Sequence, residues 1–189
     1  EAVLKGIRDV GLSLSGKENE FISRLAAAGP PFSAVTETYL LDTLENWLLT
    51  YLDGVLSAKD WKEFDKLPAL RAIFSFSETE HLNRIAPAFF VTPLNRKIPI
   101  LYSNDKPEIS LKIQEMFGQT SHPTVVGKPL VVTLLSPAGH PLQTTTDLRR
   151  FWKTSYFDVR KDMRGRYPKH PWPENPEDAM PSLRIKGKK

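Results

Sequence analysis

The chain has 189 residues, of which 40% are apolar and none is cysteine. This length suffices for one good core or two small ones, because domains commonly hold about 100 to 150 residues. The lack of cysteine excludes disulfides, thiolate metal ligands and thiol catalysis. No apolar run approaches the roughly 20 residues that a membrane helix needs, and no signal-peptide pattern opens the chain, so we expect a soluble, cytoplasmic protein without a membrane partner.

The net charge of +4 is unevenly distributed along the chain. Residues 1–148 carry 14 Lys and Arg against 17 Asp and Glu, a net charge of −3, whereas residues 149–189 carry 12 against 5, a net charge of +7. A localised positive region is typical of proteins that bind phosphate polymers or acidic surfaces. A solvated helix face followed by a loose tail would carry the same charge, so both interpretations stay open at this point.

The first part of the chain has the periodicity of short amphipathic helices. Residues 2–10 and a second stretch that stops at Gly29-Pro30-Pro31 each place apolar side chains on one side. From Glu37 to Leu52, apolar residues recur at i, i+3 or i+4 and i+7. This spacing predicts a further amphipathic helix.

Two capping-box patterns predict further helix starts. Ser57 is followed three residues later by Asp60, and Ser77 is followed three residues later by Glu80. In a capping box, the serine side chain and the acidic side chain each accept a hydrogen bond from the other's backbone N–H group. Pro87 is expected to end the last of these helices.

After Pro87 the apolar period changes to two, which is typical of strands. The expected strands cover residues 88–92, 97–102, 108–117, 130–135 and 142–145. The unbroken apolar run at 130–135, followed by a turn at residues 137–139, predicts a buried hairpin. The sequence therefore predicts five short strands after the helices.

Asp147 is expected to cap a helix from Leu148 to about Met163. At 100° per residue, this helix would have an apolar stripe of Leu148, Trp152, Val159 and Met163. A neighbouring stripe would hold Arg149, Lys153, Arg160 and Arg164, with Phe157 beside it. A basic face with an adjacent aromatic ring suits phosphate contact combined with base stacking. The alternative is that Phe157 packs against a neighbouring element.

The segment Arg164–Pro176 is rich in bases, aromatics and prolines. Its prolines are Pro168, Pro171, Pro173 and Pro176. Because proline fixes φ and lacks an N–H donor, we expect an extended path here. Such a path would present Tyr167 and Trp172 as rigid anchors, either to the protein's own surface or to a partner.

No pattern of catalytic or metal-ligating residues was found. Residues 11–18 nearly match the phosphate-binding loop G-x-x-x-x-G-K-[ST], but Glu18 offers no hydroxyl to magnesium and a helical pattern precedes the loop. The histidines, His81, His122, His140 and His170, are scattered without metal-ligand spacing. A cluster of Glu174, Glu177 and Asp178 suits a cation site, but we expect it to balance the charges of Arg164 and Arg166.

Several motifs in order carry a resemblance to a known family. They are residues 113–118 (IQEMFG), 134–138 (LLSPA) with 141–143 (PLQ), Asp147-Leu148 with Phe151-Trp152, and residues 163–173 (MRGRYPKHPWP). Together with the segment Leu44–Leu48 (LENWL), they resemble the C-terminal region of HrpB-type bacterial ATP-dependent helicases, which belong to superfamily 2 and are related to the DEAH group. The resemblance covers about residues 35–178.

This resemblance implies an α+β architecture in three parts. Residues 1–86 would be the end of a helical bundle, residues 87–146 a small OB-like five-stranded β-barrel, and residues 147–189 a basic helix with a proline-rich, family-specific tail. A whole helicase of this family would also contain a winged helix and two RecA-like domains. ATP and magnesium would bind to that helicase core, whose motifs are absent here, so we expect no cofactor and no enzymatic activity in this chain.

The resemblance and the charge distribution lead to two hypotheses. In the first, the region assists single-stranded RNA or DNA binding. Its phosphate contacts would be Arg149, Lys153, Arg160, Arg164, Arg166 and Lys169, and its stacking rings Phe157, Tyr167 or Trp172. In the second, Trp152, Tyr167 and Trp172 are structural anchors of a module that docks onto the helicase core of the same polypeptide or onto a partner protein. No sequence feature indicates an oligomeric state.

Overall fold

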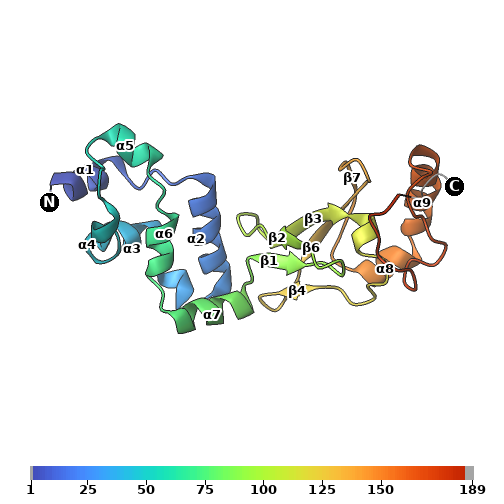
Figure 1. Ribbon diagram of the computed structural model, residues 1–189. Helices are drawn as coiled ribbons and strands as arrows, with labels where there is room; N and C mark the ends of the chain where they lie inside the picture. Colours follow the sequence, from blue (N-terminus) through green and yellow to red (C-terminus); the bar gives the residue numbers. More distant parts are fainter. Residues whose placement is uncertain (1, 186–189) are drawn as a thin grey trace. The chain divides into compact units, whose positions relative to one another are not determined.

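The computed structural model describes residues 2–185, and the chain divides into two compact units (Figure 1). Unit 1 is Glu1–Ala86 and unit 2 is Pro87–Lys189. Helices come first, small sheets follow, and further helices end the succession of elements, so the fold is mixed α+β. Within residues 2–185, no helix is long and apolar enough to cross a membrane.

Unit 1 consists of short helices. They are α1 (Ala2–Val10), α2 (Gly16–Ala28), α3 (Glu37–Asp42), α4 (Leu44–Trp47), α5 (Ala58–Glu63), α6 (Leu67–Ala72) and α7 (Phe76–Ile85), with 3-10 turns η1 (Phe32–Ala34) and η2 (Leu49–Tyr51). The amphipathic helix expected from Glu37 to Leu52 is broken at Thr43. There the hydroxyl of Thr43 donates to the carbonyl oxygen of Tyr39 at 2.7 Å, a side-chain bond that competes with the helical pattern.

One of the two predicted capping boxes is confirmed and the other is wrong. Ser57 and Asp60 form the expected reciprocal bonds at the start of α5. The box of α7 is formed by Ser75 and Glu78 and not by Ser77 and Glu80. Both pairs fit the spacing, but the earlier box adds residues to the helix.

A buried carboxylate joins two helices of unit 1. Glu18 is 1% exposed, and its two oxygens accept from the backbone N–H groups of Ser15 and Lys66, each at 2.6 Å. The side chain of Lys66 is also buried, and its ammonium donates to the carbonyl oxygens of Trp61 and Phe64 at 3.1 and 3.0 Å. Glu18 therefore holds the start of α2 against the start of α6, a structural role that replaces the rejected phosphate loop.

Unit 2 contains the strands. They are β1 (Phe89–Val91), β2 (Lys97–Pro99), β3 (Glu108–Lys112), β4 (Thr124–Val125), β5 (Lys128–Pro129), β6 (Val131–Leu135) and β7 (Pro141–Thr145). β1 pairs with β2 and β4 with β5, while β3, β6 and β7 form a third sheet in which β3 and β6 are parallel and β6 and β7 antiparallel. The expected hairpin at 130–145 is confirmed. The closed barrel of five strands is not formed by the described residues, whose strands lie in three small sheets.

The strand expected at 108–117 ends early, at Lys112. Its continuation is a 3-10 turn, η3 (Ile113–Glu115), in which Gln114 and Glu115 are each 1% exposed. One carboxylate oxygen of Glu115 pairs with the guanidinium of Arg96 at 2.6 Å. All three residues of this turn are buried, so the alternation of buried and exposed positions ends with the strand, although the alternation of apolar and polar residues continues to Gln114.

The C-terminal segment packs on the loop that follows η3. The backbone N–H of Gly118 donates to the carbonyl of Pro176 at 2.8 Å, and that of Ser182 donates to the carbonyl of Gln114 at 3.2 Å. Gly118 has a φ of +78°, and a Cβ at this position would lie 2.8 Å from the carbonyl oxygen of Ala179. Glycine is therefore required twice here, for its left-handed backbone and for the close approach of the tail.

We predict that Gly118→Ala lowers the free energy of unfolding by about 1–3 kcal/mol, because it strains a left-handed backbone and forces the tail away. Chemical denaturation followed by circular dichroism measures this loss. Gly165→Ala is the matched control, since Gly165 lies inside a helix with open space around it and alanine should stabilise it. Equal stabilities for the two variants would contradict the packing described.

We predict that Glu18→Gln destabilises the protein by about 1–3 kcal/mol, because an amide group would face backbone donors that the carboxylate now accepts. The exposed Glu63 of α5 provides the control, and Glu63→Gln should change stability by less than about 0.5 kcal/mol. Thermal unfolding of both variants would measure the difference. A Glu18 variant as stable as the control would show that these two short hydrogen bonds are dispensable.

Candidate nucleic-acid interface

The basic region of the chain folds as two helices instead of the expected single one. α8 (Leu148–Lys153) and α9 (Tyr156–Arg166) are separated at Thr154, whose backbone leaves the helical region and whose hydroxyl donates to the carbonyl of Arg150 at 2.8 Å. The basic stripe calculated for one continuous helix is therefore divided. Arg149 and Lys153 lie on α8, whereas Arg160 and Arg164 lie on α9.

Two side chains fix the start of α8. Asp147 accepts from the backbone N–H of Arg150 at 3.0 Å, as expected for its capping role. His122 contributes a contact that the sequence did not reveal, because its Nδ1 accepts from the backbone N–H of Leu148 at 3.2 Å. Its Nε2 lies 2.7 Å from the carbonyl oxygen of Leu130 and therefore acts as the donor there. His122 thus links the start of α8 to the residue that precedes β6.

Four buried aromatic rings form the centre of this region. Phe117, Phe151, Trp152 and Tyr156 are each 0–4% exposed, and neighbouring ring centroids lie 5.0–6.2 Å apart. These ring pairs are all tilted or edge-to-face, the geometry that aromatic quadrupoles favour. The indole N–H of Trp152 donates to the carbonyl oxygen of Gln119 at 2.8 Å. Trp152 is therefore an internal anchor and is unavailable for stacking on a base.

The proline-rich tail is held mainly through its carbonyl groups. The hydroxyl of Tyr156 donates to the carbonyl of Pro173 at 2.8 Å, and Nε of Arg160 donates to that of Trp172 at 3.0 Å. Trp172 is 8% exposed, and its indole N–H donates back to the carbonyl of Tyr167 at 3.0 Å. Burial raises the pKa of Tyr156, so its hydroxyl remains a donor at neutral pH.

Tyr167 and His170, which follow α9 at the start of the tail, are half-buried. Their rings meet edge to face with centroids 6.1 Å apart. Burial lowers the pKa of His170, and the charge of Lys112 acts in the same direction. His170 is therefore favoured in its neutral form, and Tyr167 has only part of its ring open to solvent.

The acidic residues of the tail balance bases other than those expected. Glu174 pairs with Arg160 at 3.2 Å, and Glu177 lies 4.0 Å from Arg149. Asp178 accepts from the side chain of Asn175. The expected counter-charging of Arg164 and Arg166 by this cluster is therefore wrong. The reason is that the tail folds back along α9 and places its carboxylates beside earlier arginines.

The predicted phosphate-binding residues fall into two groups. Arg160 has a side chain only 20% exposed and is engaged with the tail. Arg149, Lys153, Arg164, Arg166 and Lys169 are all exposed. Arg166 pairs with Asp162 at 3.2 Å on the surface of α9. Within this predicted group, Lys153, Arg164 and Lys169 are the exposed bases that form no ion pair among the described residues, so they are open to an anion.

Phe157 is the exposed aromatic ring of this surface. Its side chain is 52% exposed, and its inner edge touches Tyr156 at a centroid distance of 6.0 Å. Tyr156 itself was not singled out from the sequence, although on a continuous helix it would lie about 40° from Trp152, between the apolar stripe and the basic stripe. Its closeness to Trp152 on a helix was the sequence signal for Tyr156, but nothing in the sequence showed that its hydroxyl meets the tail.

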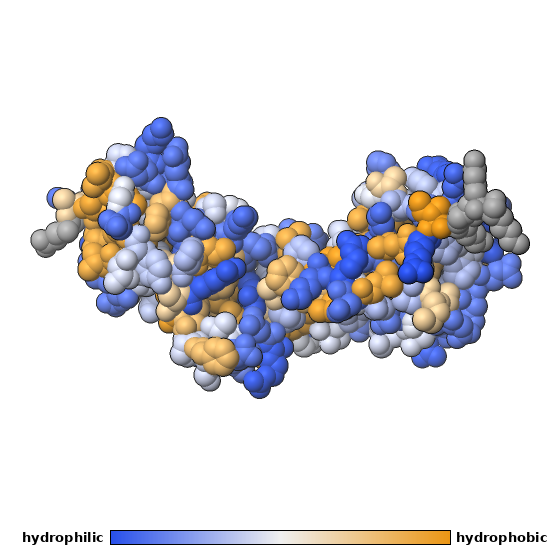
Figure 2. All heavy atoms as spheres, viewed as in Figure 1, coloured by the Kyte–Doolittle hydropathy of each residue, from blue (hydrophilic) through white to orange (hydrophobic). Residues whose placement is uncertain are grey.

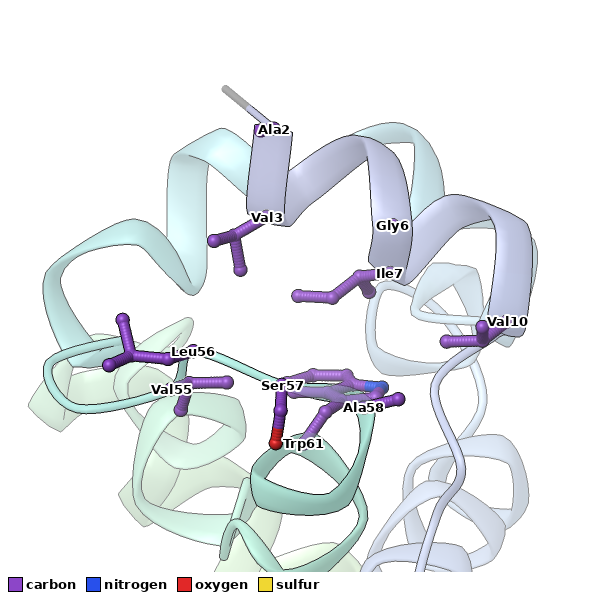
Figure 3. Close-up of a pocket in the computed structure, with 10 residues that line it drawn as sticks. All are labelled: Ala2, Val3, Gly6, Ile7, Val10, Val55, Leu56, Ser57, Ala58 and Trp61. Carbon is purple, nitrogen blue, oxygen red and sulfur yellow. The ribbon is translucent and has the colours of Figure 1, made fainter.

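An apolar groove of about 290 Å³ lies in unit 1, between α1 and the start of α5 (Figure 3). Trp61 and Ile7 are buried in its wall, while Val10 and Leu56 are 56% and 88% exposed. Figure 2 shows hydrophobic residues at the surface of the end of unit 1 that carries α1. The hydroxyl of Ser57, the polar side chain in the lining, is already bonded to Asp60 at 2.7 Å. This groove offers apolar contact and no acid or base for catalysis.

The sequence and the fold both match known helicases. Residues 47–176 match a family described as HrpB_C, ATP-dependent helicase C-terminal. The ATP-dependent RNA helicase HrpB of Escherichia coli (strain K12) is 41% identical over 197 residues, which cover 98% of this chain and 24% of the relative. This chain therefore spans about a quarter of the length of that relative.

Two solved structures are also similar. A crystal structure of the E. coli DExH-box NTPase HrpB has a TM-score of 0.85 and 39% identity, covering 94% of this chain and 23% of the other. A crystal structure of the Escherichia coli DEAH/RHA helicase HrpB has a TM-score of 0.72 and 39% identity, covering 89% and 23%. The chain belongs to the family of HrpB ATP-dependent helicases, and it corresponds to their C-terminal region.

Proposed function

We propose that this chain is an accessory region of an ATP-dependent helicase. We further propose that α8, α9 and the start of the tail, including Lys169, bind single-stranded RNA. The observation that carries the proposal is that the aromatic anchors Trp152 and Trp172 are buried, whereas several bases of the same region are exposed. Lys153, Arg164 and Lys169 are exposed, and the ring of Phe157 is 52% exposed on α9, the helix that also carries Arg164. Exposed cations around an aromatic ring can contact phosphates and stack on a base without sequence preference.

The printed names of the relatives agree with this class of ligand, since one is called an RNA helicase. A helicase must hold a strand along a path outside its motor, and an accessory basic surface would lengthen that path. In this proposal ATP hydrolysis belongs to the remaining three quarters of such a protein. The OB-like region expected at residues 87–146 would also help to hold the strand. In that case the strand would meet an open sheet, in which β3 pairs in parallel with β6, and not a closed barrel.

Docking onto the rest of the helicase is the second candidate function. The apolar groove of unit 1 favours it, because exposed Val10 and Leu56 would gain from being covered. In unit 2 the tail is bonded to α9 of the same unit. This favours a structural role for the tail within unit 2 over a role in binding the rest of the helicase. The two functions use different surfaces and are compatible with each other.

We predict that binding of the 189-residue chain to an oligouridine of about 12 nucleotides weakens with salt between about 50 and 200 mM. Replacing Lys153, Arg164 and Lys169 together by Gln should lower the slope of log K against log salt by about 2, at about 0.7 per lost phosphate contact. Fluorescence anisotropy measures both slopes. The control replaces Lys5, Lys17 and Lys59, three exposed lysines of unit 1, and should leave the slope unchanged.

No detectable RNA binding at the lowest salt would rule out the proposed function. An equal loss of slope in both triple variants would show that binding follows total charge and is not located on α8 and α9.

We predict opposite effects for two aromatic substitutions in unit 2. Phe157→Ala should weaken RNA binding by about 1–3 kcal/mol, as for a stacked base, and leave the melting temperature nearly unchanged. Trp172→Ala should lower stability by about 3–5 kcal/mol, because it empties a buried site, and should affect RNA binding only through unfolding. If Phe157→Ala binds RNA as tightly as the original chain, the ring does not stack and docking becomes the better candidate.

A further inference from the structure

A second surface, in unit 1, has chemistry opposite to that of the basic helices. It is a groove of about 360 Å³ between α3, α4, η2 and the end of α6. Its walls are formed by Tyr39, Thr43, Asn46, Trp47, Thr50 and Tyr51. Ala72 and Ile73 complete the lining. All of these residues belong to unit 1, so the groove is complete within one compact unit.

The aromatic rings of this groove are held in place yet open to a ligand. Tyr39 and Tyr51 are 42% and 38% exposed. Trp47 is 6% exposed, and its indole N–H donates to the carbonyl of Leu40 at 3.0 Å, which fixes the ring in the wall. Asn46 and Thr50 are exposed beside the rings and add hydrogen-bonding groups. Aromatic grooves with a few such polar groups recognise segments in the polyproline conformation.

The elements that form this groove carry several carboxylates and few bases. Between Arg24 and Lys59 the sequence contains no Lys, Arg or His, but it contains Glu37, Asp42, Glu45 and Asp53, each within two positions of a lining residue. Arg8 pairs with Glu45 at 2.6 Å. Arg71, which precedes Ala72 in the sequence, adds one positive charge against the three other carboxylates. This segment therefore has an excess of negative charge, which attracts cations and repels phosphates.

We propose that this groove binds an extended, proline-containing peptide flanked by Arg or Lys. Prolines lie flat against aromatic rings and lose little conformational entropy on binding, because the polyproline conformation is already formed in the free peptide. The flanking bases would meet the carboxylates of Asp42 and Asp53. The proposal does not depend on RNA binding by unit 2, since its ligand, its residues and its charge are different.

The test is a titration of the 189-residue chain with the peptide acetyl-Arg-Pro-Leu-Pro-Pro-Lys-Pro-Arg-amide. Calorimetry and the NMR signal of the Trp47 indole measure the binding. We expect saturable binding with a Kd below about 1 mM. Tyr39→Ala and Tyr51→Ala should each weaken it about fivefold, whereas Tyr39→Phe, which keeps the ring, should not. Asp42→Asn combined with Asp53→Asn should weaken it about threefold at low salt and less at high salt.

Two controls separate the groove from other surfaces. Leu56→Ala changes an exposed apolar residue of the other groove of unit 1 and should leave peptide binding unchanged. A peptide with Glu in place of its three bases should bind at least tenfold more weakly. The proposal fails if no saturable binding occurs up to about 1 mM, if the acidic peptide binds equally well, or if oligouridine displaces the basic peptide from Trp47.

Discussion

Unit 2 depends on the way its proline-rich tail is held. Four prolines within residues 164–176 remove backbone donors, so this segment cannot join a sheet and must be fixed by donors from elsewhere. Tyr156 and Arg160 supply them, to the carbonyl groups of Pro173 and Trp172. Both donors lie on α9, one helical turn apart, which aligns them with two successive carbonyls of an extended chain. The backbone of Gly118 supplies a third donor further along the tail.

This arrangement gives the basic residues of one helix different roles. Arg160 faces the tail and is consumed by internal hydrogen bonds, whereas Arg164, one turn later, remains exposed. The aromatic residues of the two helices differ in the same way, because Trp152 is buried while Phe157 is half exposed. A binding surface of exposed bases thus rests on a core of aromatic contacts. Its residues are selected by whether the tail contacts them and not by charge alone.

The two compact units differ in charge as well as in fold. Unit 1 carries 9 Lys and Arg against 13 Asp and Glu, a net charge of −4, while unit 2 carries 17 against 9, a net charge of +8. Ligands of opposite charge therefore suit the two units. A nucleic acid suits the exposed bases of unit 2, and a basic peptide suits the tyrosine-lined groove of the acidic unit 1. This difference keeps the two proposed interactions from competing for one surface.

The α+β class, the hairpin at 130–145, the caps at Ser57 and Asp147, and the family could all be predicted from the sequence. These features depend on local spacing and on contiguous motifs, which a single sequence contains. The helix breaks at Thr43 and Thr154 were decided by side-chain bonds to nearby carbonyls, which compete with a helical pattern that the sequence also fits. Only the tertiary structure showed that β3 pairs in parallel with β6 and that the strands form separate sheets. It also showed which bases are engaged within the protein, because residues 172 and 174 of the tail bond to Arg160. A contact between residues 12 to 14 positions apart is set by packing and leaves no periodic pattern in the sequence.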